Sequence, residues 1–135
     1  MLNHDQIAAA SKTLNEHWRN GSKFGGLEAS LRPRDRAEGY AIQAEIEKYS
    51  AGKLFGWKIA ATSEAGQKHI NVDGPMAGRI LAETVIPDGG TASMAGNEMR
   101  VGEPEFAFRM ARDLAPRSSP YAVREVLDAV DTLHP

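Results

Sequence analysis

The sequence has no cysteine among its 135 residues. This absence excludes a disulfide framework, a thiolate nucleophile and a zinc–cysteine site, and it fits a cytoplasmic protein. No apolar run approaches the ~20 residues of a membrane span, and the N-terminus lacks the basic and then apolar segments of a signal peptide. The formal net charge is −2 and no block of one sign occurs, so we expect neither a nucleic-acid nor a membrane partner.

What the chain does contain is the composition of a globular domain, with 41% hydrophobic and 25% charged residues. Apolar stripes at helical spacing come first, and alternating strand patterns follow. This order predicts an α+β fold, with an N-terminal α/β lobe over residues 1–75 and the start of a β-rich core over residues 76–135. The predicted helices span 4–19, 35–50, 63–69 and 120–133, and the predicted strands span 53–61, 78–85 and 99–113.

Two carboxylates, Glu103 and Glu105, stand two residues apart in the last predicted strand. Because side chains alternate between the faces of a strand, both glutamates are predicted on one face together with Arg109. Neighbouring acidic groups repel unless a positive charge lies between them, and that charge is either a divalent cation or a basic side chain such as Arg109. Pro104 cannot donate a ladder hydrogen bond, which predicts an edge or a bulge. The opposite face, predicted to be core, carries Phe106, Phe108 and Met110.

Lys58 lies among apolar neighbours in the predicted strand 53–61. Burying a lysine is costly unless its charge is paired, so Lys58 is a candidate functional residue. The alternative is an edge-strand lysine that reaches water or pairs structurally with a glutamate.

Three arginines, Arg32, Arg34 and Arg36, flank the start of the second predicted helix. In one interpretation they form a solvated, charged loop. In the other, one of them binds a substrate carboxylate through two hydrogen bonds, and Arg32 is the candidate.

Several motifs stand in an order that is similar to a known family. They are Tyr-Ala-Ile-Gln at 40–43, Gly-Trp-Lys-Ile at 56–59, Gln67, Gly-Glu-Pro-Glu-Phe-Ala-Phe at 102–108, Asp-Leu at 113–114 and Tyr121. The chain resembles the 2-keto-4-pentenoate hydratase family, which includes 4-oxalocrotonate decarboxylase and is related to the fumarylacetoacetate hydrolases. The resemblance implies the start of a fumarylacetoacetate-hydrolase-like mixed β core.

This resemblance implies an enzyme that hydrates a small 2-hydroxy-dienoate or 2-oxo acid in aromatic-compound catabolism. Glu103 and Glu105 match two carboxylate ligands of a Mg²⁺ or Mn²⁺ ion, and a hard cation suits chemistry that develops enolate charge. Lys58 matches a lysine that serves as a charge partner or a proton-transfer group. Arg32 and Asp73 are assigned to substrate binding, and the family implies a homo-oligomer.

Two departures from the family pattern leave alternatives open. The third acidic ligand of the family lies beyond the position of Pro135, so the chain is expected to represent the N-terminal half of such an enzyme. Ala60-Ala61 follows the Gly-Trp-Lys-Ile motif where a glycine is common, and the substrate is left open. The alternatives are a decarboxylase, a C–C hydrolase of the same superfamily, and a non-catalytic piece that assembles with another chain.

Overall fold

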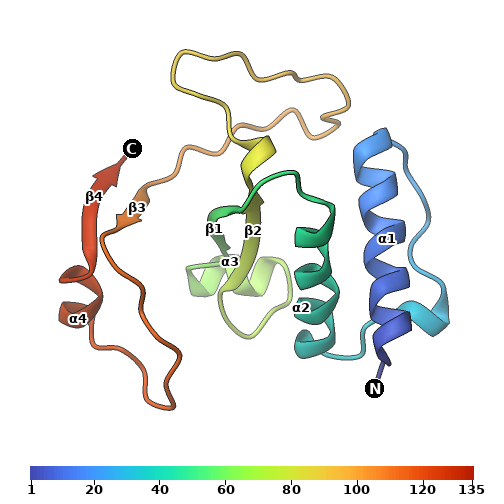
Figure 1. Ribbon diagram of the computed structural model, residues 1–135, viewed down its shortest axis with the longest axis horizontal. Helices are drawn as coiled ribbons and strands as arrows, with labels where there is room; N and C mark the ends of the chain where they lie inside the picture. Colours follow the sequence, from blue (N-terminus) through green and yellow to red (C-terminus); the bar gives the residue numbers. More distant parts are fainter. The chain divides into compact units, whose positions relative to one another are not determined.

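The computed structural model describes residues 1–135 and divides into two compact units, Met1–Ser93 and Met94–Pro135. The mixture of helices and strands confirms the predicted α+β class (Figure 1). No helix combines the length and the hydrophobicity needed to cross a bilayer. The elements are α1 (His4–Asn20), α2 (Arg36–Ala44), β1 (Leu54–Ala60), α3 (Glu64–His69), β2 (Met76–Leu81), β3 (Ala107–Met110), α4 (Val123–Leu127) and β4 (Val130–His134), with 3₁₀ helices at Ala29–Leu31, Glu45–Tyr49 and Ala82–Thr84.

The first helix, α1, begins and ends where local sequence signals predict. The Asn3 side chain accepts a hydrogen bond from the Gln6 N–H at 2.9 Å, and the Gln6 side chain accepts one from the Asn3 N–H at the same distance. This reciprocal pair satisfies two donors that the helix itself leaves unpaired. Gly21 ends the helix in the left-handed conformation, with φ 61°, which glycine adopts without steric cost.

The core of the first unit lies between α1 and α2. Its buried residues are Leu2, Ala10 and Ile42, with Ile7, Leu27 and Leu31 packed against them. The carboxylate of Glu38, on α2, is also buried, and it accepts hydrogen bonds from the Arg34 N–H at 2.8 Å and from the Leu2 N–H at 2.7 Å. These donors, Arg34 first, hold the pKa of Glu38 below its ordinary value. The buried acid therefore fastens the N-terminal segment to α2.

A two-stranded antiparallel sheet, β1–β2, completes the first unit. Helix α2 lies beside β2 (Figure 1). The Tyr40 hydroxyl accepts a hydrogen bond from the Ala77 N–H at 3.1 Å, and the Gln43 side-chain amide donates one to the Ala77 carbonyl at 3.1 Å. The helix thus satisfies backbone groups on the outer edge of β2. Strands β1 and β2 therefore lie in the same compact unit, and the division expected between residues 75 and 76 remains a prediction.

The second unit contains a β3–β4 antiparallel pair, which corrects two expectations. The helix predicted over 120–133 is wrong beyond Leu127, because the alternating, β-branched segment Val130–His134 forms β4. The strand predicted over 99–113 is restricted to Ala107–Met110. Residues 101–106 lie outside regular secondary structure, in keeping with the missing N–H of Pro104.

The apolar face of β3 was expected to be core, and in this chain that expectation is wrong. Phe106, Phe108 and Met110 are 76%, 58% and 42% exposed. The reason is that a two-stranded ribbon offers no second layer. Ala129 is the only fully buried hydrophobic residue of the second unit.

Candidate functional site

Lys58 lies in the middle of β1, on the better-covered of its two faces. Burial alternates along the strand, so that Gly56, Lys58 and Ala60 are half-buried while the residues between them are exposed. In the antiparallel register, Gly78 of β2 lies directly opposite Lys58, and opposite residues share a face. The lysine is therefore presented from a paired strand among glycine and alanine neighbours.

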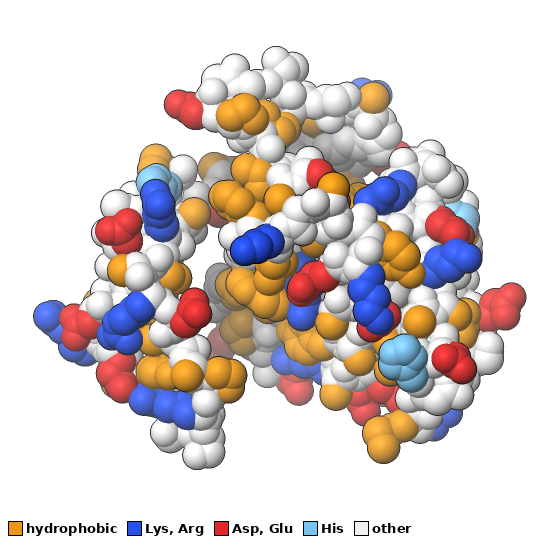
Figure 2. Space-filling view, in the orientation of Figure 1, with side chains coloured by type: hydrophobic (Ala, Val, Ile, Leu, Met, Phe, Trp, Pro, Cys, Tyr) orange, Lys and Arg blue, Asp and Glu red, His pale blue; other side chains and the backbone are white.

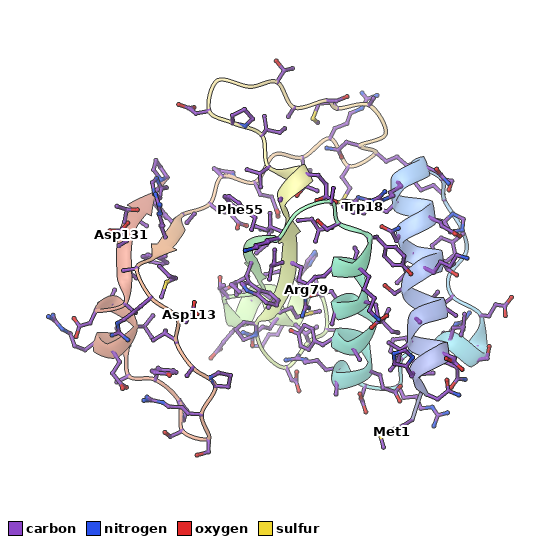
Figure 3. All side chains as sticks on the ribbon, viewed as in Figure 1. Met1, Trp18, Phe55, Arg79, Asp113 and Asp131 are labelled. Atoms are coloured by element: carbon purple, nitrogen blue, oxygen red, sulfur yellow. The ribbon has the colours of Figure 1, made fainter.

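The other face of β1 carries an aromatic and ionic network that the sequence alone did not predict. The guanidinium of Arg79, on β2, lies 4.6 Å from the centre of the Trp57 ring. It also donates hydrogen bonds to Glu47 at 2.5 Å and to Gln43 at 2.9 Å, and Figure 3 shows Arg79 between β2 and α2. Arg79 lies opposite Trp57 because of the register between β1 and β2, which cannot be read from the sequence alone.

This second face is largely open. Phe55 is 65% exposed and Ile59 is 46% exposed, and Figure 2 shows apolar side chains at the surface over β1 and β2. The two faces of one sheet thus differ in kind. One carries exposed aromatic and aliphatic side chains, and the other carries a lysine whose nearest neighbours along β1 and directly across on β2 are glycine and alanine.

The end of the Lys58 strand is fixed by a strained residue. Ala61 has φ 54°, in the left-handed region that disfavours a residue with a Cβ. Its carbonyl accepts a hydrogen bond from the Gln67 side chain at 3.0 Å, and Ser63 caps α3 through the Gly66 N–H at 3.1 Å. Both interactions hold the turn that follows the lysine.

Arg32 and Asp73 lie elsewhere in the first unit, each with a partner of its own. Arg32 is at the end of the 3₁₀ helix Ala29–Leu31, and its Nε donates to the Leu27 carbonyl at 2.6 Å. Asp73 lies in the turn before β2 and forms an ion pair with Arg36. Their assignment to substrate binding remains a prediction.

Glu103 and Glu105 lie in the second unit, in the irregular segment before β3, and both are exposed. Carboxylate oxygens are the ligands that Mg²⁺ and Mn²⁺ prefer. Within each unit, no cluster of three or more histidine, aspartate or glutamate side chains could hold a metal ion. The two glutamates therefore fit part of an oxygen-ligand site and not the whole of one.

The loop that follows β3 is organised by an ion pair that the sequence did not predict. Arg117 donates two hydrogen bonds to the Glu125 carboxylate, at 2.9 and 2.7 Å, and its guanidinium lies 3.6 Å from the centre of the Tyr121 ring. The Ala122 N–H also donates to Glu125 at 2.7 Å. The Arg117 hydrogen bonds, followed by that of Ala122, lower the pKa of Glu125 to about 2. The glutamate three residues after a helix start was the available signal.

Comparison with known proteins finds two curated relatives. The 2-keto-4-pentenoate hydratase of Burkholderia vietnamiensis is 29% identical over 125 residues, covering 90% of this chain and 48% of the relative. The 2-keto-4-pentenoate hydratase 1 of Dechloromonas aromatica is 30% identical over 118 residues, covering 84% of this chain and 44% of the relative. No family model and no solved structure matches the chain.

The aligned stretch determines which candidate residues and how much of each relative these matches include. A match over 90% of the chain includes Lys58, Glu103 and Glu105, because none of the three lies within a tenth of the chain from either end. The chain spans about half the length of the curated relatives that it matches.

Proposed function

We propose that this chain, which is similar to two 2-keto-4-pentenoate hydratases over about half of their length, belongs to that family as its N-terminal half. We propose further that it serves a metal-dependent hydratase of a small 2-hydroxy-dienoate or 2-oxo acid. The observation that carries the proposal is the similarity to two hydratases over a stretch that contains Lys58, Glu103 and Glu105. The proposed reaction adds water across a C=C bond of the substrate, as part of aromatic-compound catabolism. We further propose that the working protein is a homo-oligomer.

Each candidate residue has a role that follows from its chemistry. Glu103 and Glu105 would hold Mg²⁺ or Mn²⁺ through their carboxylate oxygens. When bound, such an ion supplies positive charge that stabilises a developing enolate. Lys58 holds the anionic end of the substrate or moves a proton, and its half-buried strand position strengthens the attraction by limiting competition from water. Arg32 or Asp73 would orient the substrate after leaving the partner that each has here.

Replacing the acidic pair tests the metal role. Glu105→Gln removes one negative charge from the pair, and we expect it to lower hydration of 2-hydroxypenta-2,4-dienoate by roughly 100-fold or more. The loss of the substrate's ultraviolet absorbance measures the rate. Mg²⁺ or Mn²⁺ should also raise the Tm of the unsubstituted protein, because an ion that binds only the native state stabilises it.

A matched control uses Glu98→Gln, which removes the same charge from the same unit. It should leave both the rate and the metal-dependent rise in Tm unchanged. Equal rates for the Glu98→Gln and Glu105→Gln proteins would contradict the metal assignment. A protein that releases CO₂ from a 2-oxo acid instead of hydrating a dienoate would be a decarboxylase of the same family.

The exposed apolar strands favour a second candidate function, a non-catalytic piece that acts only after assembly with another polypeptide. Phe55 and Ile59 on β1 are 65% and 46% exposed, and Phe106 and Phe108 at β3 are 76% and 58% exposed. Each unit thus presents neighbouring apolar side chains of the kind that mark an interaction surface. Light scattering after size-exclusion chromatography separates the candidates. A monomer with hydratase activity would exclude the assembly function, whereas an inactive protein that gains activity with a partner would support it.

A further inference from the structure

We propose that Gly78 and Gly56 form the floor of a substrate seat beside Lys58 and that they limit the length of the 2-oxo acid that binds there. The inference rests on the proposed function, and it goes further by assigning a size limit to two residues that carry no side chain. It concerns the first unit alone.

Neither glycine is required by the backbone. Glycines inside strands are usually explained by a positive φ or by the close approach of another group. The glycines with positive φ are Gly21, Gly26, Gly89 and Gly96, and neither Gly56 nor Gly78 is among them. A register shift lies between Leu54 and Gly56, but without a positive φ it does not demand glycine.

Neither glycine is required by packing. A Cβ added to Gly56 would meet no atom within 4 Å, and a Cβ added to Gly78 would meet only the Lys58 carbonyl oxygen, at 3.9 Å, which is an ordinary contact. Gly52 shows the opposite case, because its Cβ would lie 2.8 Å from the Ala82 Cβ. Glycine weakens a strand, so two glycines that the fold does not need point to a use for the space above them.

That space surrounds the lysine. On the shared face, Lys58 has Gly56 and Ala60 as neighbours along β1 and Gly78 directly across on β2. The diagonal positions on β2 are Met76 and Ile80, both half-buried. A cation thus stands over a floor of small residues that is bordered by two apolar side chains. This combination suits a carboxylate joined to a short apolar chain, the chemistry of a small 2-oxo acid.

The seat is also rigid enough to discriminate by size. Its two strands are paired on either side of Lys58, and α2 binds the backbone of Ala77 between Met76 and Gly78. A simple shift of β2 could therefore not relieve a clash between a long substrate and a side chain introduced at position 78.

The test is binding of pyruvate and of 2-oxopentanoate to the full chain in the presence of Mg²⁺, measured by calorimetry and by the amide shifts of β1. Gly78→Val adds a β-branched side chain that a strand tolerates. We expect it to weaken 2-oxopentanoate binding at least about tenfold, with a smaller effect on pyruvate, and to leave the Tm unchanged or higher. Gly56→Val should act in the same direction.

Two controls make each outcome decisive. Ala77→Val adds volume to the same strand on the opposite face and should not affect binding, whereas Gly52→Ala should lower the Tm. Unchanged 2-oxopentanoate binding by folded Gly78→Val protein would overturn the size limit and leave the proposed function standing. If the unsubstituted protein binds neither acid, the proposed function fails together with the seat. A large fall in the Tm of both valine variants would show that the fold needs these glycines, which also overturns the inference.

Discussion

The two sheets of this protein have the same form and opposite surroundings. Both β1–β2 and β3–β4 are antiparallel pairs. In the first, α2 binds the backbone of Ala77, and Leu81 is 2% exposed. In the second, every residue of β3 is exposed. The first sheet therefore has an anchored edge and one half-buried face, and the second has neither.

This difference shows what each sheet can support by itself. An isolated two-stranded ribbon is marginally stable in water, and it needs further strands or a helix to cover a face. The β1–β2 sheet has that support and can hold Lys58 in one place. Glu103 and Glu105 lie in the segment just before β3. The loop after β3 is held by polar contacts such as the hydrogen bonds between Arg117 and Glu125. The metal binding that we propose for Glu103 and Glu105 is therefore expected to depend on coverage of β3.

The largest change in stability is expected when one apolar side chain is removed from each unit. Ile42 is 4% exposed in the first unit and Leu133 is 56% exposed in the second. Ile42→Ala should destabilise the first unit by about 2–5 kcal/mol, because a cavity is left in the core. Leu133→Ala should cost roughly 0.5 kcal/mol or less, the usual range for an exposed position.

Native-state hydrogen exchange measures both effects, because it reports the stability of each unit separately. The amides of β1 and β2 should lose protection in Ile42→Ala protein and keep it in Leu133→Ala protein. A Leu133→Ala cost as large as that of Ile42→Ala would show that β3–β4 is covered in solution, and the contrast between the sheets would then be lost.

The same contrast explains how much of the fold could be predicted from the sequence. Helices α1 and α2 were predictable because their signals are local, such as the caps at Asn3 and Asp35 and the stop at Gly21. Strand β1 followed from alternation alone. In contrast, β4 was predicted as helix, because only its pairing with β3, whose partner residues lie 20 or more positions earlier in the chain, decides its form.

For the candidate site, the sequence predicts which residues take part, but it does not predict how they are arranged. Motif spacing nominates Lys58, Glu103 and Glu105, since side-chain chemistry is visible in the sequence, and their roles remain predictions. The tolerance for a Cβ at Gly78 and the position of Arg79 over Trp57 were not visible, because both depend on the register between β1 and β2. Register is set by contacts between distant residues.

An intermediate effect is expected from acid, which should loosen the polar order of the second unit. The pKa of Glu125 is lowered from 4.5 to about 2. Its hydrogen bonds to Arg117 therefore stabilise the native state in full above pH 4.5, and this stabilisation is lost as the pH falls through about 2. The amide shift of Ala122 should therefore follow a titration with a midpoint near pH 2. Glu125→Gln should abolish that titration, and a midpoint near pH 4.5 in the unsubstituted protein would contradict the ion pair.

The smallest expected effect compares two strained residues, one in each unit. Ala61 has φ 54° and Arg100 has φ 51°, and a residue with a Cβ costs roughly 1–2 kcal/mol in this conformation. Ala61 cannot relax easily, because β1 precedes it and Gln67 binds its carbonyl. Ala61→Gly should therefore stabilise the first unit by about 1 kcal/mol, the relief of strain less the added chain entropy. Arg100→Gly should have little effect, because the segment around it lies outside regular structure and can relieve strain by moving. Urea unfolding of both variants measures the difference, and an equal gain for both would mean that the segment before Glu103 is held as firmly as the end of β1.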